Sequence, residues 1–464
     1  MVRQRIRDPL HDLIEFDTER DEFEGILWKA IQTKPFQRLR RVKQLGFSDL
    51  VYPGATHSRF AHSIGVFHTA RMLMDVIGKH VHKVEVSKMR EALAAALVHD
   101  LGHGPFSHAF ENVGRRLGLK MADHEHVSDV LIRDSEVAIV LNELGSGFAN
   151  DVADIIRGRG KKNIYSAVVS SQFDADRLDY MRRDRLMTGT QHAGIDFKWL
   201  IANLQIASVS FGVDESSIGE IETFVLGPKA IFGAEAYVLG LFQLYPTVYF
   251  HKATRGAEKI FGELLYRTIM LIQNDSLNAT GLPSNHPIVR FAWKPDDVES
   301  ALGLDDTSVW GALPLMCEAA DDAIASLAQS LRYRELGKCI DIREKVAHAV
   351  EDSGKADDAV DACCAKIKEK LTDWLASQAS DIPPIHIDEA QRSPYKLVEE
   401  TQGPLDRINI YTNGGKLVDL KQRSAVVAAV KPFKLFRVYC KRSDMETQRV
   451  IGAIVEGEIN NARQ

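Results

Sequence analysis

The chain has 464 residues, of which 45% are hydrophobic and 26% are charged, and its formal net charge is −6. These values are ordinary for a globular protein of two or three domains, and the negative charge argues against binding nucleic acid through a broad basic surface. No apolar run approaches the roughly 20 residues of a membrane span. The five cysteines lack metal or redox spacing, and the first residues lack a secretory apolar segment, so we expect reduced thiols and a cytoplasmic protein.

The first third of the sequence predicts a short extended entry followed by helices. Asp8-Pro9-Leu10 predicts a turn, and a helix is expected over residues 22–31. Residues 35–46 predict a strongly basic helix that Gly46 ends; it is either a solvated cationic face or a phosphate-binding helix. Further helices are expected at residues 59–78, 87–100 and 106–117, from Asp123 onward, and through 173–185.

The second half predicts a looser arrangement that ends in a small mixed lobe. A β-like piece at 224–228 precedes a helix, and prolines over 281–310 indicate a loop or junction. The later expectations are helices over 307–377, a linker at 382–385, strands at 407–411 and 434–440, and a short helix from Met445. We therefore expect a mostly α fold with a small α+β C-terminal lobe, divided at residues 1–280, 281–382 and 383–464.

Histidines are concentrated in one stretch, because ten of the sixteen lie between His57 and His126. Within it, His99 and Asp100 end an apolar helical run. Adjacent residues do not share a helix face, so both can reach one point only if the helix ends there. Glycines and a proline directly follow. An imidazole with a carboxylate suits Mn, Fe, Zn or Ni. The alternative is a plain helix end with surface histidines, and the local density of histidine favours the metal.

Three further patterns involve possible site residues. Arg59 and His62 are three residues apart and share a helix face. Glu111 follows His108 at the same spacing, and a carboxylate there can fix the imidazole tautomer; the alternative is a weak surface ion pair. Asp176, Tyr180 and Asp184 form one helical stripe. Such dense charge usually marks a solvated face, but a tyrosine between two carboxylates on an inward stripe is less easily explained that way.

The segments 36–46, 53–63 and 99–108, with Asp176 on a later helix, together resemble the HD-domain metal-dependent phosphohydrolases. The resemblance is to the deoxynucleoside triphosphate triphosphohydrolase branch, which includes the vertebrate enzyme that pairs a sterile alpha motif with an HD domain. It covers roughly residues 3–260 and returns at 404–411 and 437–441. The resemblance implies an HD-domain helical core. It also implies one divalent ion, with Mn favoured among Mn, Fe, Zn, Ni and Mg, and additional Mg with the nucleotide. The implied ligands are His62, His99, Asp100 and Asp176.

The resemblance also implies attack of an activated water on the α-phosphorus and release of triphosphate. His108, poised by Glu111, is the first candidate for the acid that protonates the leaving group, and His124 is the second. His103 and Arg59 would hold phosphate oxygens. The positions that match substrate contacts in the family are Gln44, Leu45, Arg177, Tyr180, Asp184, Tyr249 and Lys252.

Two positions depart from the family pattern. Leu241 stands where the vertebrate member has an arginine for the terminal phosphates. Gln32 stands where an acidic residue recognises guanine at the allosteric site, although Arg38 and Arg40 of that site remain. Nucleotide activation and a homodimer or homotetramer are expected by resemblance. The alternatives are a phosphohydrolase for another nucleotide, a nucleotide-sensing scaffold, and nucleic-acid binding through basic residues at 157–162 and 182–185.

Overall fold

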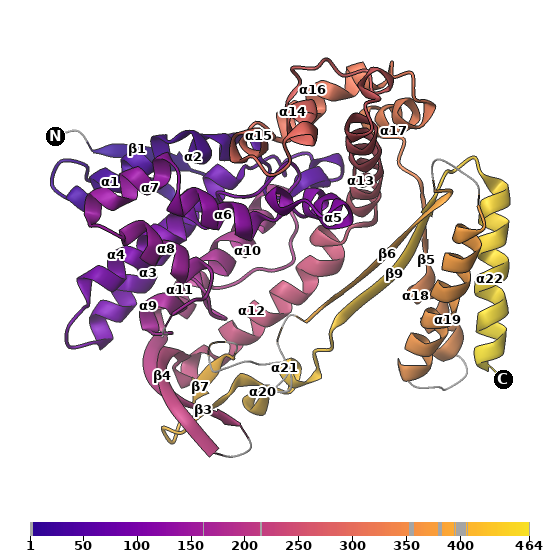
Figure 1. Cartoon of the computed structure of the whole chain (residues 1–464). Coiled ribbons are helices and arrows are strands. Elements are labelled where there is room, and N and C mark those ends of the chain that lie inside the picture. The colour runs from indigo at the N-terminus through magenta and orange to yellow at the C-terminus, as the bar shows by residue number, and fades with distance from the viewer. Residues whose placement is uncertain are drawn as a thin grey trace.

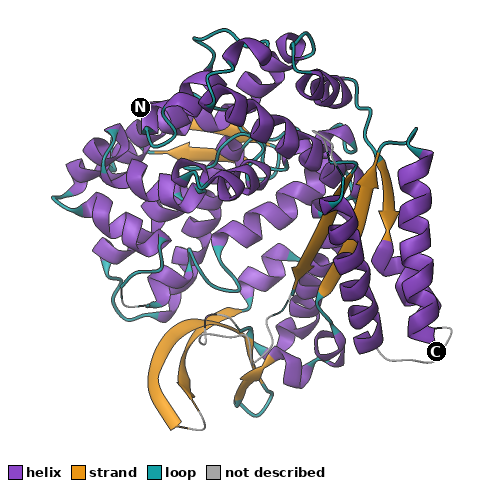
Figure 2. Cartoon of the chain, turned by 45° about the vertical axis from the view of Figure 1, so that its right-hand side comes forward, coloured by secondary structure: helices purple, strands orange, loops and turns teal. Residues whose placement is uncertain are grey.

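The computed structural model describes residues 3–160, 162–213, 216–351, 357–378, 383–393, 395, 405 and 407–463. Helices dominate, and the strands form three small sheets (Figures 1 and 2). The predicted mostly α fold with a small α+β C-terminal lobe is thereby confirmed. None of the helices in the described ranges has the length and hydrophobicity that a membrane span requires.

The N-terminal body is a helical core preceded by the antiparallel hairpin β1–β2. Its largest hydrophobic cluster joins the hairpin to α3, α4, α10 and α12, as Phe16 stacks on Phe67 with ring centroids 5.1 Å apart. The elements are β1 Gln4–Asp8, β2 Asp12–Phe16, α1 Glu22–Gln32, α2 Lys34–Arg38, α3 Arg59–His80, α4 Val86–Val98, α5 His108–Leu117, α6 His124–Arg133, α7 Glu136–Leu141, α8 Phe148–Ile156, α9 Ile164–Ala167, α10 Ala175–Thr188, α11 Phe197–Ala202 and α12 Ile231–Leu244.

A second hydrophobic cluster packs α13 against α5 and against the helices that follow α13 in the chain. These are α13 Lys252–Gln273, α14 Pro287–Trp293, α15 Val298–Leu302, α16 Asp306–Met316 and α17 Asp322–Arg332. A π-helical turn, Tyr245–Tyr249, separates α12 from α13. Such turns are rare and frequently occur at functional sites.

The C-terminal lobe packs helices on a three-stranded sheet of order β5-β9-β6 and has its own core (Figure 1). Its elements are β5 Lys338–Asp341, α18 Ile342–Glu351, α19 Asp357–Ala376, β6 Ile385–Arg392, β9 Phe433–Cys440 and α22 Met445–Arg463. A four-stranded sheet joins strands of the first body to a later part of the chain. Its strands are, in order, β3 Leu204–Val213, β4 Ser216–Leu226, β7 Asn409–Tyr411 and β8 Leu417–Asp419. The short helices α20 Leu420–Arg423 and α21 Ala425–Ala429 follow β8. The packing thus divides the segment 281–382 between the second and third cores, and the domain bounds remain a prediction.

The predicted basic helix over 35–46 is wrong beyond Arg38. The chain continues as a short 3₁₀ turn, Leu39–Arg41, and then extends. The Val42 carbonyl accepts a hydrogen bond from the Arg59 amide at 2.9 Å, and Lys43 forms a β-bridge with Ser58. Tertiary pairing with the segment before α3 therefore overrides the local helical pattern.

Two other expectations for the second half were wrong, and a third was incomplete. The segment 281–310 is not a loop, because it contains α14, α15 and the start of α16; Pro287 occupies the first turn of α14, where proline is tolerated. Strand β5 interrupts the helices expected over 307–377. The β-like piece expected at 224–228 is confirmed as far as Leu226, where it forms the end of β4 before α12, but it belongs to a longer hairpin, β3–β4, than the sequence indicated. Residue 382 of the expected linker and residues 404 and 406 of the family-like segment lie outside the described residues.

Candidate metal centre and active site

Buried polar groups fix the conformation of the loop from His99 to Ser107, which joins α4 to α5. Arg38 donates to the carbonyls of Leu304 at 2.9 Å and His103 at 2.8 Å. Asp306, the first residue of α16, accepts from the Phe106 amide at 2.8 Å. Phe106 and Ser107 have φ of 53° and 54°, which non-glycine residues seldom adopt. The surrounding structure therefore determines the conformation of this loop.

The four residues predicted as metal ligands come together at the ends of α3, α4 and α10. His62 Nε2 lies 2.9 Å from Asp176 Oδ1 and 4.0 Å from Asp100 Oδ2. His99 Nε2 lies 3.3 Å from Asp100 Oδ1 and 3.7 Å from Asp176 Oδ1. Two imidazoles and two carboxylates from three helices thus face one point, the donor set of a borderline divalent ion.

The hydrogen bonds behind the two imidazoles leave their Nε2 atoms for this point. His99 Nδ1 donates to the Ala96 carbonyl at 3.0 Å, and His62 Nδ1 donates to Asp179 Oδ2 at 2.9 Å. Metal-ligating histidines commonly donate their other ring N–H to a carbonyl or a carboxylate. His99 Nε2 is buried and has no hydrogen-bond partner among the described residues. The residues therefore fit a divalent cation.

Electrostatics in the cluster favour anionic carboxylates. Burial raises the pKa of Asp100, but the Arg59, His99 and His103 side chains outweigh burial and hold this pKa well below its usual range. Burial lowers the pKa of His62, and hydrogen bonds to Asp176 and Asp179 reverse this effect and raise it to about 10. A cation bound here would replace the proton on His62 Nε2.

Asp179 and Arg183 support this cluster, and the sequence argument missed both. They lie one and two turns after Asp176 on α10 and are fully buried, with Arg183 Nε donating to Asp179 Oδ2 at 2.7 Å. Gly65 makes room for them on α3: a Cβ there would lie 2.2 Å from both Arg183 Nη2 and Asp179 Oδ1. The spacing 176, 179, 183 is itself helical and could have indicated an inward face.

A second cluster of histidines surrounds Glu111 on α5. His108 Nδ1 lies 3.1 Å from Glu111 Oε2, and His124 Nδ1 hydrogen-bonds the other oxygen. His103 stacks on His124 with ring centroids 4.0 Å apart, and its Nε2 lies 3.3 Å from Asp100 Oδ1. Burial raises the pKa of Glu111, but hydrogen bonds to His108 and His124, together with the charge interactions with the same two rings, outweigh burial and lower this pKa well below its usual range. Glu111 is therefore an anion that orients two imidazoles. They lie beside the group of His62, His99, Asp100 and Asp176, called the metal-type cluster below.

His108 and His103 differ in exposure within this second cluster. The His108 side chain is 71% exposed, so a substrate could reach its ring. His103 is buried, and burial together with the Arg59 cation holds its pKa well below the usual value. His103 is thus a neutral ring. The helix expected from Asp123 onward is confirmed as α6, and Asp123 caps its start, because the Asp123 side chain accepts from the His126 amide at 3.0 Å.

Arg59 and Arg177 are held in fixed positions. Arg59 is buried; its Nη1 lies 2.5 Å from Asp100 Oδ2, and its Nε donates to Ser107 Oγ at 2.8 Å. Arg177 Nη1 donates to the Ser171 carbonyl at 3.0 Å. Burial lowers the pKa of Arg177, but the Asp174 carboxylate together with Tyr237, Tyr180 and Asp176 outweighs burial and raises this pKa. The Arg177 guanidinium therefore remains charged.

The residues predicted around the sugar form a connected group. The Tyr249 hydroxyl donates to Asp184 Oδ2 at 2.9 Å, and the ring of Tyr180 lies edge-on to that of Tyr249, with centroids 6.2 Å apart. His57 Nε2 lies 2.8 Å from Asp184 Oδ1, a contact that the sequence argument missed. Burial raises the pKa of both tyrosines well above the ordinary value, so both hydroxyls stay protonated.

The other predicted substrate contacts are more scattered. The Gln44 amide donates to the His57 carbonyl at 3.0 Å, and Leu45 packs against the first hydrophobic cluster. Leu241 is buried in α12. Lys252 is exposed at the start of α13, where it lines a groove between α13, α17 and β9 together with Arg334, Lys338, Lys441 and Arg442.

The residues predicted for an allosteric nucleotide are in different environments. Arg38 is buried and its guanidinium is bonded to backbone carbonyls, so it is not presented to a nucleotide. Arg40 is exposed; its guanidinium stacks 3.5 Å from the centroid of Phe60, and its Nε donates to Gln37 at 2.8 Å. Gln32 is exposed at the end of α1.

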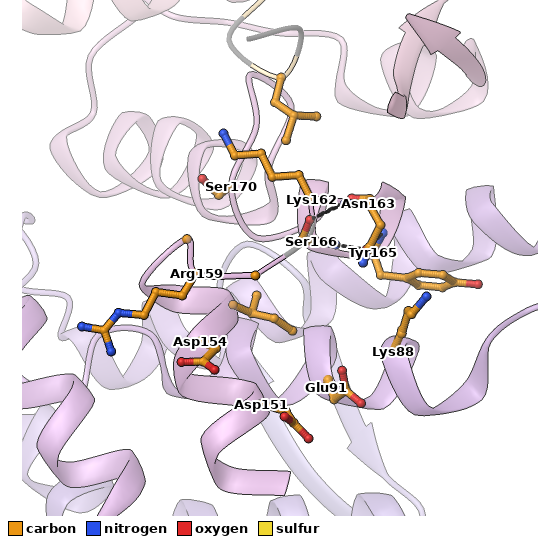
Figure 3. Close-up of a pocket in the computed structure, with 14 residues that line it drawn as sticks. Lys88, Glu91, Asp151, Asp154, Arg159, Lys162, Asn163, Tyr165, Ser166 and Ser170 are labelled. Carbon is orange, nitrogen blue, oxygen red and sulfur yellow. Dashed lines mark hydrogen bonds between the residues drawn. The ribbon is translucent and has the colours of Figure 1, made fainter. Parts of the chain in front are cut away.

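Gly158, Arg159, Gly160 and Lys162 of the basic loop line one side of a hollow between α4, α8 and α9 (Figure 3). The cations of this loop face acids: Arg157 Nη1 lies 3.0 Å from Glu125 Oε2, and Arg159 Nη1 lies 4.0 Å from Asp129 Oδ2. The carboxylates of Asp151 and Asp154 also line the hollow, and Lys161 lies outside the described residues. This mixture of charges gives little support to nucleic-acid binding.

Comparison with known families identifies the helical core. The family description "HD domain" matches residues 59–182, which include all four predicted metal ligands. The chain contains an HD domain. The resemblance predicted from the motifs is thereby confirmed, and the match runs from α3 to α10, the helices that carry His62 and Asp176, the first and last of the predicted metal ligands.

The HD-domain chain also aligns with curated relatives and solved structures. It is 37% identical over 266 residues to the uncharacterized protein YwfO of Bacillus subtilis, covering 57% of this chain and 56% of YwfO. It is homologous to the deoxynucleoside triphosphate triphosphohydrolase SAMHD1 of Mus musculus, at 27% identity over 94% of this chain and 68% of that protein, and of Homo sapiens, at 25% over 95% and 71%. A phosphohydrolase from Bacteroides thetaiotaomicron shares the fold, with a TM-score of 0.70 and 24% identity over 95% of this chain and 100% of that one.

Proposed function

We propose that this HD-domain protein hydrolyses deoxynucleoside triphosphates to deoxynucleoside and triphosphate. The observation that carries the proposal is the convergence of His62, His99, Asp100 and Asp176 beside the Glu111 cluster, because a cation held by these four side chains would lie next to oriented imidazoles. The names of the SAMHD1 relatives, which align over most of this chain, support the choice of substrate.

The residues of the chain divide the work of the reaction. His62, His99, Asp100 and Asp176 would hold a divalent cation, which when bound would supply Lewis-acid chemistry and lower the pKa of water to roughly 7, so that a nucleophile is available near neutral pH. Arg59 and His103 lie on either side of Asp100, where they would hold phosphate oxygens. His108, exposed and oriented by Glu111, would protonate the departing 5′-oxygen, with His124 on the same carboxylate as the second candidate.

Deoxyribose selection would come from the Tyr180, Asp184 and Tyr249 group. Tyr249 and Asp184 are hydrogen-bonded to each other and pack beside Tyr180, so they form a fixed wall. A wall of this kind leaves little room for a 2′-hydroxyl. Gln44, joined through its backbone to His57, and Leu45 would line the same sugar, and Arg177 would contribute a phosphate-binding cation.

Leu241 supports one alternative within catalysis. Its buried aliphatic side chain cannot grip a terminal phosphate, so the substrate could be a nucleotide with fewer phosphates, such as a monophosphate or a signalling nucleotide. A nucleotide-sensing scaffold, active through its oligomeric state, is the alternative outside catalysis. A binding role does not require His108 to be both exposed and oriented by Glu111, which favours an enzyme.

Metal analysis followed by product chromatography tests the proposal. The purified protein is assayed for Mn, Fe, Zn, Ni and Mg, stripped with chelator, reloaded with one metal at a time, and supplied with each dNTP, each NTP and the monophosphates. We expect triphosphate release from dNTPs, with Mn²⁺ the first metal to try and Mg²⁺ added with the nucleotide. Release of inorganic phosphate or nucleoside from monophosphates alone would favour the other phosphohydrolase. A biological effect that survives in inactive His62→Ala would favour the scaffold.

A nucleotide activator and a homodimer or homotetramer remain part of the proposal. The groove that holds Lys252 supports the activator, because five cationic side chains line it: Lys252, Arg334, Lys338, Lys441 and Arg442. Such a groove suits a polyphosphate. Light scattering with and without each dNTP, run beside the activity assay, measures both properties. An unchanged mass and a hyperbolic rate curve would contradict activation through assembly.

A further inference from the structure

The turn of the hairpin β1–β2 reaches the back of the metal-type cluster. His62 Nδ1 donates to Asp179 Oδ2 at 2.9 Å, and His11, in the hairpin turn, places its Nε2 2.7 Å from the other oxygen of the same carboxylate. The side chains of His11 and Asp179 are 3% and 0% exposed. One buried carboxylate thus joins the hairpin turn to a predicted metal ligand.

Asp8, the last residue of β1, completes the buried group from the other side. Arg183 Nη1 donates to Asp8 Oδ2 at 2.7 Å, while Arg183 Nε donates to Asp179 Oδ2 at 2.7 Å. Asp8 Oδ1 also accepts from the amides of Leu10 and His11, both at 2.9 Å, which fixes the turn. Because buried charges need partners, the guanidinium between these two carboxylates locks the position of Asp179.

The polar turn is not what attaches the hairpin to the body. Ile14 and Phe16 are fully buried, and Phe16 stacks on Phe67 of α3. Arg71 Nη1 donates to the Glu15 carbonyl at 2.9 Å. These contacts attach β2 to α3 and involve neither Asp8 nor His11. The buried Asp8 and His11 side chains therefore call for a role other than anchoring.

We propose that the hairpin turn is a structural part of the metal centre, in which Asp8 and His11 position Asp179, and Asp179 holds the His62 ring with Nε2 toward the cation. The four residues Asp8, His11, Asp179 and Arg183 are positioning residues, because they act through His62. This inference rests on the proposed function, which makes His62 a metal ligand. Outer partners of this kind typically change metal affinity by 10–100-fold when they are removed.

Binding of Co²⁺ alone to the chelator-stripped full chain tests the inference without any turnover. Asp8→Asn keeps the size of the side chain and removes the charge that holds Arg183, and His11→Ala removes one contact to Asp179. Asp12→Asn is the matched control, since Asp12 lies in the same turn but pairs with Arg7 on the surface, with side chains 82% and 75% exposed. Each protein is titrated by chelator competition, its Co²⁺ absorption spectrum is recorded, and its fold is checked by circular dichroism.

We expect Asp8→Asn and His11→Ala to weaken Co²⁺ binding by about 10–100-fold and to shift the absorption bands, while Asp12→Asn behaves as wild type. A merely structural role would lower the thermal midpoint without moving affinity or spectrum. If Asp8→Asn does not fold, His11→Ala decides the question. Unchanged affinity and spectrum in the folded variants would overturn the inference and leave the proposed function intact, whereas a wild type that binds no Co²⁺ would overturn His62 as a ligand.

Discussion

Gly65 lies three residues after His62 on α3, and the Asp179–Arg183 ion pair of α10 occupies the space beside its Cα. A Cβ at this position would lie 2.2 Å from both Asp179 Oδ1 and Arg183 Nη2. Real Cβ atoms keep more than 3 Å from such neighbours, so Gly65→Ala must push the pair away from α3. Both groups are fully buried, and neither can move into solvent.

The size of the effect follows from two opposing terms. Replacing glycine by alanine inside a helix stabilises by about 1 kcal/mol. Separating a buried ion pair costs about 3–5 kcal/mol, because a charge is left without its partner. We therefore expect Gly65→Ala to lower the free energy of unfolding by about 2–4 kcal/mol. It should also weaken divalent-metal binding, since Asp179 holds His62.

Gly78→Ala is the matched control on the same helix, because the nearest atom to its added Cβ would be Val84 Cγ2, at 4.0 Å. Thermal unfolding of both metal-free variants, with Co²⁺ titrations of each, measures the two effects. Gly78→Ala should match or exceed the wild-type midpoint and bind Co²⁺ as wild type does. A Gly65→Ala protein as stable as Gly78→Ala, with unchanged affinity, would refute the account of α3 and α10 packing.

Three further predictions concern the surroundings of the site. Burial raises the pKa of Asp306 to about 7; the folded state then holds a proton that the unfolded state lacks between pH 3.8 and about 7, so this group makes stability fall by about 1.4 kcal/mol per pH unit as pH rises through that window. The difference in unfolding free energy between wild type and Asp306→Asn should show this slope from pH 5 to about pH 7 and level off by pH 8, and a flat difference throughout would contradict the raised pKa. Glu111→Gln removes the anion that orients His108, and we expect kcat to fall about 100-fold with Co²⁺ affinity retained; loss of the metal instead would point to a ligand role for Glu111. Tyr249→Phe removes the hydrogen bond that the Tyr249 hydroxyl donates to Asp184. The ratio of kcat/KM for dATP to kcat/KM for ATP should then drop about tenfold. An unchanged ratio would exclude the Tyr180, Asp184 and Tyr249 group from sugar selection.

Part of the candidate site is legible in the sequence because its chemistry is local. Glycines and a proline in the sequence predict the helix end at which His99 and Asp100 lie. His108 and Glu111 are three residues apart, a spacing that puts them on one face of a helix. The structure adds the supporting groups. Asp179, Arg183 and Gly65 carry no motif of their own, and their roles depend on how closely α3 approaches α10. Arg38 shows the converse, since a basic pattern that suggested a phosphate site became a buried support for the loop at His103.

The sequence by itself determined which types of residue are candidate metal ligands and the order in which they occur along the chain. It also determined that the fold is mostly α-helical. These properties depend on residue type and on spacing within single elements. Tertiary structure alone decided that the helix expected over 35–46 gives way after Arg38 to an extended segment beside Ser58, and that the turn holding Asp8 and His11 closes the back of the metal-type cluster. The physical reason is that backbone groups and buried charges in one segment find their partners in a segment distant in the sequence, and only the folded chain brings the two together. No local pattern encodes that meeting.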